Sequence, residues 1–130
     1  MRVLFVEDSE VNRLVIREML RAGDIEMAEA VDGAAGLRMI GDNDYDLILM
    51  DLRMPGMDGI TAIRHLRARG DHKARLPVIV VTADAGATIE ADCLAAGADD
   101  VVLKPVSMSA LYEAIGAVLA REGQDAVLLA

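Results

Sequence analysis

Four short apolar runs in this sequence each end in a polar residue that could take part in chemistry. Glu7 and Asp8 follow the run 3–6, Asp51 follows 47–50, Thr82 follows 78–81 and Lys104 follows 101–103. A further run, 25–31, ends without such a group. If these runs are parallel strands, their carboxyl ends meet at one edge of a sheet, where ligands of open α/β sheets bind. Three carboxylates, a hydroxyl and an ammonium placed together there would fit metal-assisted phosphoryl chemistry on an aspartate.

The pattern of the chain predicts parallel strands. Continuous Val, Ile and Leu runs are typical of strands that are buried on both faces. The segments between them are long enough for crossover helices, which we expect at 9–22, 34–40, 59–69, 87–96 and 109–121. Ser9 is a candidate N-cap for the first of these helices. The predicted fold class is therefore a single α/β domain of five βα units, with helices on both faces of the sheet.

Composition excludes several classes of function. The chain has 130 residues and a net charge of −9, which argues against direct binding to nucleic acid. No apolar run approaches the ~20 residues needed to span a bilayer, and no secretory signal is evident. The single cysteine, Cys93, cannot form an internal disulfide and is expected to be a buried or half-buried helix residue. We therefore expect a cytoplasmic, monomeric protein that does not bind membranes.

The acidic residues predict a metal site and a nucleophile. Glu7, Asp8 and Asp51 would repel one another strongly unless a cation or shifted pKa values relieved the repulsion. Hard oxygen ligands in a small cluster favour Mg²⁺. Asp51, which ends the most apolar run, is the best candidate nucleophile for a phosphoryl group. Lys104 could pair with a phosphoryl oxygen, and Thr82 could donate a hydrogen bond to another.

These residues lie in motifs that resemble the receiver domain of two-component response regulators. The matching segments are Val6-Glu7-Asp8, Asp51 with Met54-Pro55-Gly56-Met57-Asp58-Gly59, Val81-Thr82-Ala83 and Lys104-Pro105. The resemblance covers roughly residues 2–121, which gives a receiver domain at 1–121 and a C-terminal tail at 122–130. It implies the flavodoxin-like, doubly wound fold, with a five-stranded parallel sheet in the order 2-1-3-4-5.

The resemblance also implies a role for each site residue. Asp51 would accept a phosphoryl group from a phosphohistidine on a sensor histidine kinase or a histidine phosphotransfer protein. Asp8 and Asp51 would bind Mg²⁺ directly, Glu7 through water, and Arg53 through its backbone carbonyl. Thr82 and Lys104 would complete the site, and the Lys104–Pro105 bond would be cis. The protein would then be a conformational switch or a phosphate sink rather than an enzyme with a substrate of its own.

One position departs from the pattern of the family. Receivers often carry Tyr or Phe three residues before the lysine, where this chain has Val101. Valine is small and stiff about χ1, so it cannot swing as an aromatic side chain does. We therefore expect the signal to pass through the small-residue loop 83–88 and the helix that follows it.

Three other features of the sequence allow more than one interpretation. Arg13, Arg17 and Arg21 would line one face of the first helix, either as a docking surface for the histidine partner or as a solvated basic face. The tail could fold back or dock on a partner. The start at Met1 favours a stand-alone receiver over one that belongs to a longer hybrid kinase.

The residues of the site also distinguish a phosphoacceptor from two other functions. A phosphohydrolase of the haloacid-dehalogenase type needs an acid two residues after the nucleophile, and that position is Arg53. A pseudo-receiver, which serves only for protein contacts, would be expected to lack an acid, the threonine or the lysine. All of these residues are present, which favours the phosphoacceptor.

Overall fold

A computed structural model describes the backbone of residues 1–129 and the side chains of residues 1–122. Five strands form one parallel sheet in the order β2-β1-β3-β4-β5, as predicted. The strands are β1 (Arg2–Val6), β2 (Glu26–Ala30), β3 (Leu47–Asp51), β4 (Val78–Thr82) and β5 (Asp100–Leu103). The helices are α1 (Glu10–Arg21), α2 (Gly33–Asp42), α3 (Gly59–Arg67), α4 (Ala87–Ala96) and α5 (Met108–Leu129), with the 3-10 turn η1 (His72–Arg75) before β4.

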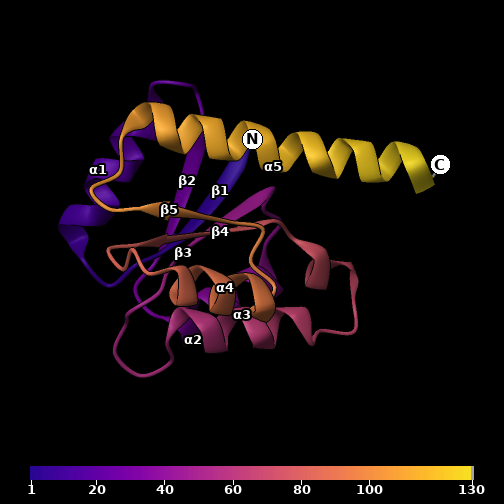
Figure 1. The fold of residues 1–130 in the computed structure, drawn as a ribbon, viewed down its shortest axis with the longest axis horizontal. Helices are drawn as coiled ribbons and strands as arrows, with labels where there is room; N and C mark the ends of the chain where they lie inside the picture. Colours follow the sequence, from indigo (N-terminus) through magenta and orange to yellow (C-terminus); the bar gives the residue numbers. More distant parts are fainter. Residues whose placement is uncertain (130) are drawn as a thin grey trace.

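The helices cover both faces of the sheet, which confirms the doubly wound α/β fold. Helices α1 and α5 lie on one face, and α2, α3 and α4 lie on the other (Figure 1). Side chains of β1, β3 and β4 alternate between the two layers because successive residues of a strand point to opposite faces. Those packed toward α1 and α5 are Val3, Phe5, Leu47, Leu49, Ile79 and Val81. Those packed toward the other helices are Leu4, Val6, Ile48, Met50, Val78 and Val80.

Local capping explains where three helices begin and where α4 ends. Ser9 accepts a hydrogen bond from the backbone N–H of Asn12, so it is the N-cap of α1, as predicted. Asp32 and Asp58 cap α2 and α3 in the same way. Gly97, with a φ of 117°, ends α4 in the left-handed conformation that glycine adopts without strain. The caps therefore fix the first residues of α1, α2 and α3 next to the carboxyl ends of the strands that precede them.

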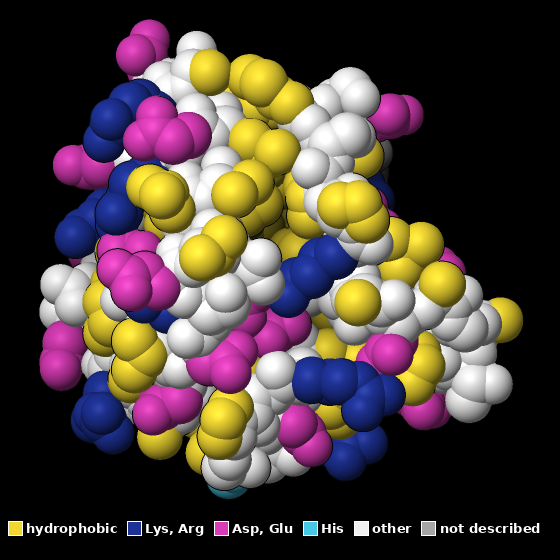
Figure 2. Space-filling model, turned by 90° about the vertical axis from the view of Figure 1, so that its left-hand side faces the viewer, with side chains coloured by type: hydrophobic (Ala, Val, Ile, Leu, Met, Phe, Trp, Pro, Cys, Tyr) yellow, Lys and Arg dark blue, Asp and Glu magenta, His cyan; other side chains and the backbone are white. Residues whose placement is uncertain are grey.

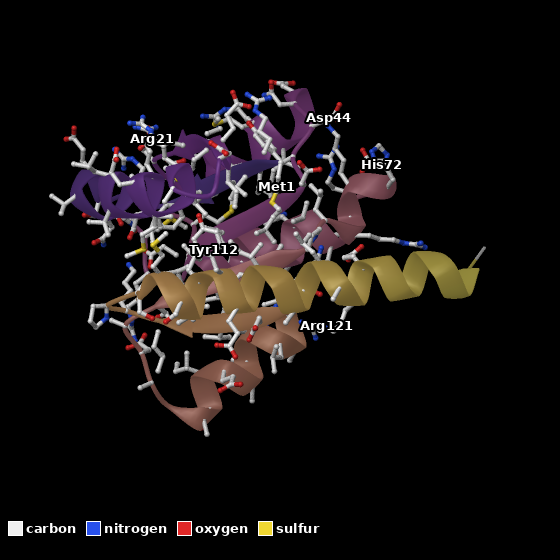
Figure 3. The ribbon with its side chains drawn as sticks, turned by 90° about the horizontal axis from the view of Figure 1, so that it is seen from above. Met1, Arg21, Asp44, His72, Tyr112 and Arg121 are labelled. Carbon is white, nitrogen blue, oxygen red and sulfur yellow. The ribbon has the colours of Figure 1, made fainter. Side chains whose placement is uncertain are left out.

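The last helix is longer than the sequence pattern indicated. α5 continues to Leu129 rather than ending at 121, and its last turns extend beyond the sheet (Figure 1). The tail at 122–130 consists mostly of residues whose side chains lie outside the described part of the chain, so the predicted domain boundary stays a prediction. Near its start, α5 is anchored to α1, because the hydroxyl of Tyr112 donates to the carbonyl of Met19 at 2.6 Å (Figure 3).

Two further expectations concern buried residues and membranes. Cys93 is fully buried in α4, as predicted, and burial raises the pKa of its thiol. Within the described residues, none of the helices combines the length and the apolar character that crossing a bilayer would require.

Candidate functional site

The register of the sheet brings the predicted site residues to one edge. In the parallel ladder, Val6 lies opposite Met50 and Asp51 lies opposite Val81, so Glu7, Asp51 and Thr82 end three neighbouring strands. Thr82 in turn lies opposite Leu103, and the backbone N–H of Lys104 donates to the Thr82 carbonyl at 2.8 Å. The Lys104–Pro105 bond is cis, as the resemblance implied.

Three carboxylates gather at the centre of this edge. Glu7, Asp8 and Asp51 each offer an oxygen atom, and these oxygens lie within 4.8 Å of one another. Glu7 and Asp51 are buried, with 1% and 5% of their surface exposed, whereas Asp8 is exposed. Acidic side chains occupy the middle of this face in Figure 2, with a cationic side chain beside them. The predicted acidic cluster is therefore present and is open to solvent on the Asp8 side.

Lys104 supplies the positive charge at the cluster. Its ammonium nitrogen lies 2.7 Å from Glu7 Oε1 and 3.2 Å from Asp51 Oδ1. Burial lowers the pKa of Lys104, but hydrogen bonds and charges from Glu7 and Asp51 outweigh burial and hold the pKa above its ordinary value. The ammonium is therefore a permanent charge that bridges two acids in the resting protein.

The two buried acids are shifted in opposite directions. Burial, followed by the hydrogen bond and charge of Glu7, raises the pKa of Asp51 to about 7 against the opposing effect of Lys104. Burial also raises the pKa of Glu7, but hydrogen bonds with Asp51, Lys104 and Asn12 outweigh burial and leave this pKa below its ordinary value. Glu7 is thus the acid that stays ionised, and without a further cation Asp51 readily holds a proton.

The donor set fits a small, hard cation. Three carboxylates supply the oxygen ligands that Mg²⁺ prefers, and their mutual repulsion is only partly offset by one ammonium. Glu7 Oε2 is buried and accepts no hydrogen bond from the described residues. A buried carboxylate oxygen without a donor is costly, so this atom is free to interact with an ion or with its bound water.

Thr82 and Arg53 lie at the sides of the cluster. Thr82 is 2% exposed, and its hydroxyl oxygen accepts a hydrogen bond from the backbone N–H of Asp84 at 3.1 Å. The carboxylate of Asp84 accepts from Nε of Arg53 at 2.5 Å, while the Arg53 side chain is largely exposed. The guanidinium of Arg53 therefore pairs with Asp84 and joins the loop after β3 to the loop after β4.

Backbone shape at the end of β3 is set by glycine. A Cβ atom added at Gly59, the first residue of α3, would lie 2.3 Å from the backbone oxygen of Asp51. The N–H of Gly59 donates to the Leu52 carbonyl at 2.9 Å. α3 therefore begins directly against the strand end that carries Asp51, which only glycine permits.

Helix α1 contributes groups that the sequence did not reveal. Asn12 Nδ2 donates to Glu7 Oε1 at 2.8 Å, and Arg13 Nη1 donates to the Glu7 backbone carbonyl at 2.7 Å. Arg13 and Arg17 also form ion pairs with Glu29 of β2. Arg21 is exposed (Figure 3), whereas Arg13 and Arg17 are partly buried, so a solvated basic face does not describe the whole row. The docking role of these arginines stays a prediction.

The comparisons with known proteins agree with this geometry. Residues 3–116 match the family described as the response regulator receiver domain. The two-component response regulator ORR41 of rice is 40% identical, with 92% of each chain covered. The chemotaxis protein CheY of Pseudomonas aeruginosa is 35% identical over 93% of this chain and 98% of its own.

Solved structures and longer relatives show the same domain. The receiver domain of the sensor histidine kinase PA1611 of Pseudomonas aeruginosa, solved with a magnesium ion coordinated in its active site cleft, superposes with a TM-score of 0.83. It is 35% identical over 92% of this chain and 97% of its own. Other relatives are longer: the chain spans 52% of the transcriptional regulatory protein PrrA of Mycobacterium tuberculosis, at 36% identity and 96% of this chain. This chain belongs to the response regulator receiver domain family of two-component signalling.

Proposed function

We propose that this chain accepts a phosphoryl group on Asp51 from a phosphohistidine and acts as a Mg²⁺-dependent switch or phosphate sink in a phosphorelay. The observation that carries this proposal is the position of Asp51. It is a buried carboxylate at the end of the central strand, with two other acids and one ammonium around it. This arrangement suits a reactive carboxylate better than it suits a structural ion pair, because the acids outnumber the cation.

Asp51 is the nucleophile of the proposed reaction. A carboxylate oxygen of Asp51 forms a bond to phosphorus while the bond between phosphorus and the donor imidazole nitrogen breaks. The imidazole leaves with the electron pair of that bond and takes up a proton. Because burial raises the pKa of Asp51 to about 7, the residue must lose its own proton to be reactive, and Lys104 favours that loss.

The other residues hold charge and position. Glu7, Asp8, Asp51 and the backbone carbonyl of Arg53 are the proposed partners of Mg²⁺. When bound, the ion neutralises charge that develops on the phosphoryl oxygens. Lys104 pairs with a phosphoryl oxygen, and the Thr82 hydroxyl donates to another after release from the Asp84 N–H. The magnesium ion in the PA1611 receiver supports the assignment of the metal.

The proposed donor is a sensor histidine kinase or a histidine phosphotransfer protein. Support comes from relatives that carry a similar segment inside such kinases, including the sensor histidine kinase RcsC of Salmonella typhi. We propose that the protein works as a monomer in the cytoplasm, without binding nucleic acid or membranes, and that its own role is regulatory.

Intact-mass measurement after incubation with acetyl phosphate and Mg²⁺ tests the proposal. The wild type should gain a labile adduct with the mass of one phosphoryl group, and Asp51→Asn should gain none. Asp58→Asn is the matched control, since Asp58 is an exposed acid in the neighbouring loop and asparagine retains its capping role. The control should be labelled as well as the wild type.

The same experiment separates the proposal from its alternative. An unlabelled wild type would favour a pseudo-receiver that serves only for protein contacts. Full labelling of Asp51→Asn would show that another residue is the acceptor, and the assignment of Asp51 would be wrong.

A further inference from the structure

The peptide group between Glu7 and Asp8 leaves the sheet beside the acidic cluster. β1 ends at Val6, and the N–H of Glu7 still donates to the Ala30 carbonyl at 3.0 Å. The Glu7 carbonyl instead accepts a hydrogen bond from Nη1 of Arg13 in α1, at 2.7 Å. A side chain of α1 therefore takes the place of the strand ladder in fixing the backbone at this point.

Arg13 is itself held in place by a second contact. Its Nε donates to Glu29 Oε1 of β2 at 3.2 Å, and only 12% of the Arg13 side chain is exposed. The donors of a guanidinium have a fixed planar geometry, so an Arg13 that is anchored on Glu29 presents Nη1 in a defined direction. Arg17 pairs with the other oxygen of Glu29, but among the described residues only Arg13 also reaches the Glu7 carbonyl.

The direction of the Asp8 side chain depends on this stretch of backbone. Asp8 is exposed, so little packing surrounds it, whereas Glu7 is buried. The carboxylate of Glu7 is in addition held by Asn12 and Lys104. A rotation of the peptide group between Glu7 and Asp8 would therefore move the Asp8 carboxylate relative to Asp51, the other acid assigned to direct contact with Mg²⁺.

We propose that Arg13 is a positioning residue that holds Asp8 in place for Mg²⁺ by fixing the Glu7 carbonyl. The inference rests on the proposed Mg²⁺-dependent function and adds to it a residue outside the acidic cluster. Charge and position make opposite predictions, because a cation near three acids disfavours the binding of another cation. If Arg13 acted by charge alone, its removal would strengthen Mg²⁺ binding, whereas removal of a positioning residue weakens it.

Calorimetric titration of the metal-free protein with Mg²⁺ tests the proposal without any phosphorylation. Arg13→Met keeps an unbranched apolar stem and suits a helix, but it removes the charge and the donors. We expect its Mg²⁺ affinity to fall about tenfold, at the low end of the range for groups that orient a metal ligand. Arg17→Met is the matched control, since it loses the same charge and a bond to the same Glu29 but leaves Arg13 on the Glu7 carbonyl. The control should bind Mg²⁺ at least as tightly as the wild type.

Two further readouts separate positioning from a general disturbance of α1. The N–H of Asp8 belongs to the same peptide group as the Glu7 carbonyl, so the amide ¹⁵N resonance of Asp8 should shift in metal-free Arg13→Met and much less in Arg17→Met. The Mg²⁺ concentration for half-maximal labelling by acetyl phosphate should rise in Arg13→Met. The rate at saturating Mg²⁺ should stay unchanged, because a bound ion itself holds Asp8.

The melting temperature of each metal-free variant reports whether the fold is retained. If Arg13→Met does not fold, Arg13→Lys takes its place, since lysine keeps the charge and loses the planar guanidinium. Charge alone then predicts an unchanged Mg²⁺ affinity, whereas positioning by the guanidinium predicts a weaker one.

Each outcome bears on a different claim. An Arg13 variant that binds Mg²⁺ as tightly as the wild type, or more tightly, would overturn the positioning role. Equal weakening in the Arg13 and Arg17 variants would overturn it as well, because Arg17 holds Glu29 and not the Glu7 carbonyl in the described structure. In both cases the magnesium site would stand, whereas a wild type that binds no Mg²⁺ would refute the proposed Mg²⁺-dependent function together with this inference.

Discussion

The backbone N–H of Asp84 donates a hydrogen bond to the hydroxyl oxygen of Thr82, with 3.1 Å between the two atoms. The carboxylate of Asp84 is bound in turn by Arg53 from the loop after β3. Thr82 is therefore connected through one residue to both loops beside the acidic cluster. If Thr82 turns toward a phosphoryl group on Asp51, Asp84 loses this bond and the start of the loop 83–88 is released. This gives a physical route from the site to α4.

Replacement of Thr82 by alanine should separate phosphorylation from its structural consequence. The variant keeps Asp51 and the acids, so it should still be labelled, but it has no hydroxyl to move. Amide hydrogen exchange with and without phosphorylation should therefore change across 83–97 in the wild type and not in Thr82→Ala. Thr88→Ala, which removes an exposed hydroxyl from the same region, should behave as the wild type. Exchange that changes only within 52–59 in the wild type would contradict the route.

Substitution of Val101 by tyrosine should have a weak effect on the response of a partner. Val101 is half-buried and packs at the edge of the core beneath α4. We expect no other residue of the chain to move in response to the rotamer of an aromatic side chain added at this position. Partner binding measured with phosphorylated protein should be close to that of the wild type. A large gain in response would mean that the aromatic position governs signalling in this chain as well.

The ion pair between Arg53 and Asp84 should restrain the loop after β4 without adding much to overall stability. Arg53 is largely exposed, and exposed pairs contribute little because solvent and salt screen them. Arg53→Gln should therefore leave the melting temperature nearly unchanged while hydrogen exchange becomes faster near Asp84. The matched control is Arg69→Gln, which breaks another surface pair, with Asp71, before the start of β4 rather than after its end. Equal exchange at Asp84 in both variants would show that the pair does not hold the loop.

The parts of the structure that the sequence predicted are those that depend on local pattern. Apolar runs indicated all five strands, and Ser9 marked the start of α1, because burial and capping leave short-range signals. The strand order followed from the family resemblance rather than from the pattern. The end of α5 was missed because Gly123 weakens the helical pattern there.

Side-chain pairs between distant segments could not be predicted in the same way. The acids of the site were identified because each ends a strand, and parallel strands bring their ends together. The bond from Asn12 to Glu7 depends on the angle at which α1 leaves the sheet, and no spacing in the sequence encodes that angle. The pairing of Arg13 and Arg17 with Glu29 likewise depends on how α1 packs beside β2.

The close contact between α3 and β3 should make Gly59 intolerant of any side chain. Alanine normally stabilises a helix relative to glycine by up to ~1 kcal/mol. At Gly59, however, its methyl group would lie 2.3 Å from the Asp51 backbone oxygen. We expect Gly59→Ala to lower the free energy of unfolding by about 1–3 kcal/mol, the usual range for overpacking. Urea denaturation provides the measurement.

Gly70 offers the control for this substitution. A Cβ added at Gly70 would meet no atom within 4 Å, so Gly70→Ala should change stability by less than about 0.5 kcal/mol. If Gly59→Ala proved as stable as the wild type, α3 could shift away from Asp51 without cost. The strand end that carries the acceptor would then be less rigid than the structure indicates.

The raised pKa of Asp51 predicts how stability and metal binding depend on pH. In the metal-free fold this pKa is about 7, whereas the ordinary value is 3.8. At pH values between these two, Asp51 holds a proton in the folded protein that it has released in the unfolded chain. The contribution of Asp51 to stability is therefore fully present below the ordinary pKa and is lost as pH rises through the folded pKa, by at most about 1.4 kcal/mol per pH unit for one proton. Glu7, whose pKa is lowered, has the opposite dependence and contributes above its ordinary pKa.

Comparison with Asp51→Asn isolates the effect of Asp51, because asparagine resembles the protonated acid. Near the ordinary pKa the two metal-free proteins should have similar stability, and the variant should become increasingly the more stable of the two as pH rises toward the folded pKa of about 7. Mg²⁺ needs the ionised carboxylate, so its affinity for the wild type should increase up to about tenfold per pH unit until pH passes the folded pKa. In Asp51→Asn that increase should be absent. A wild-type Mg²⁺ affinity that stayed constant from about pH 5 to 8 would show that Asp51 is already ionised in the metal-free protein, with Lys104 outweighing burial and Glu7.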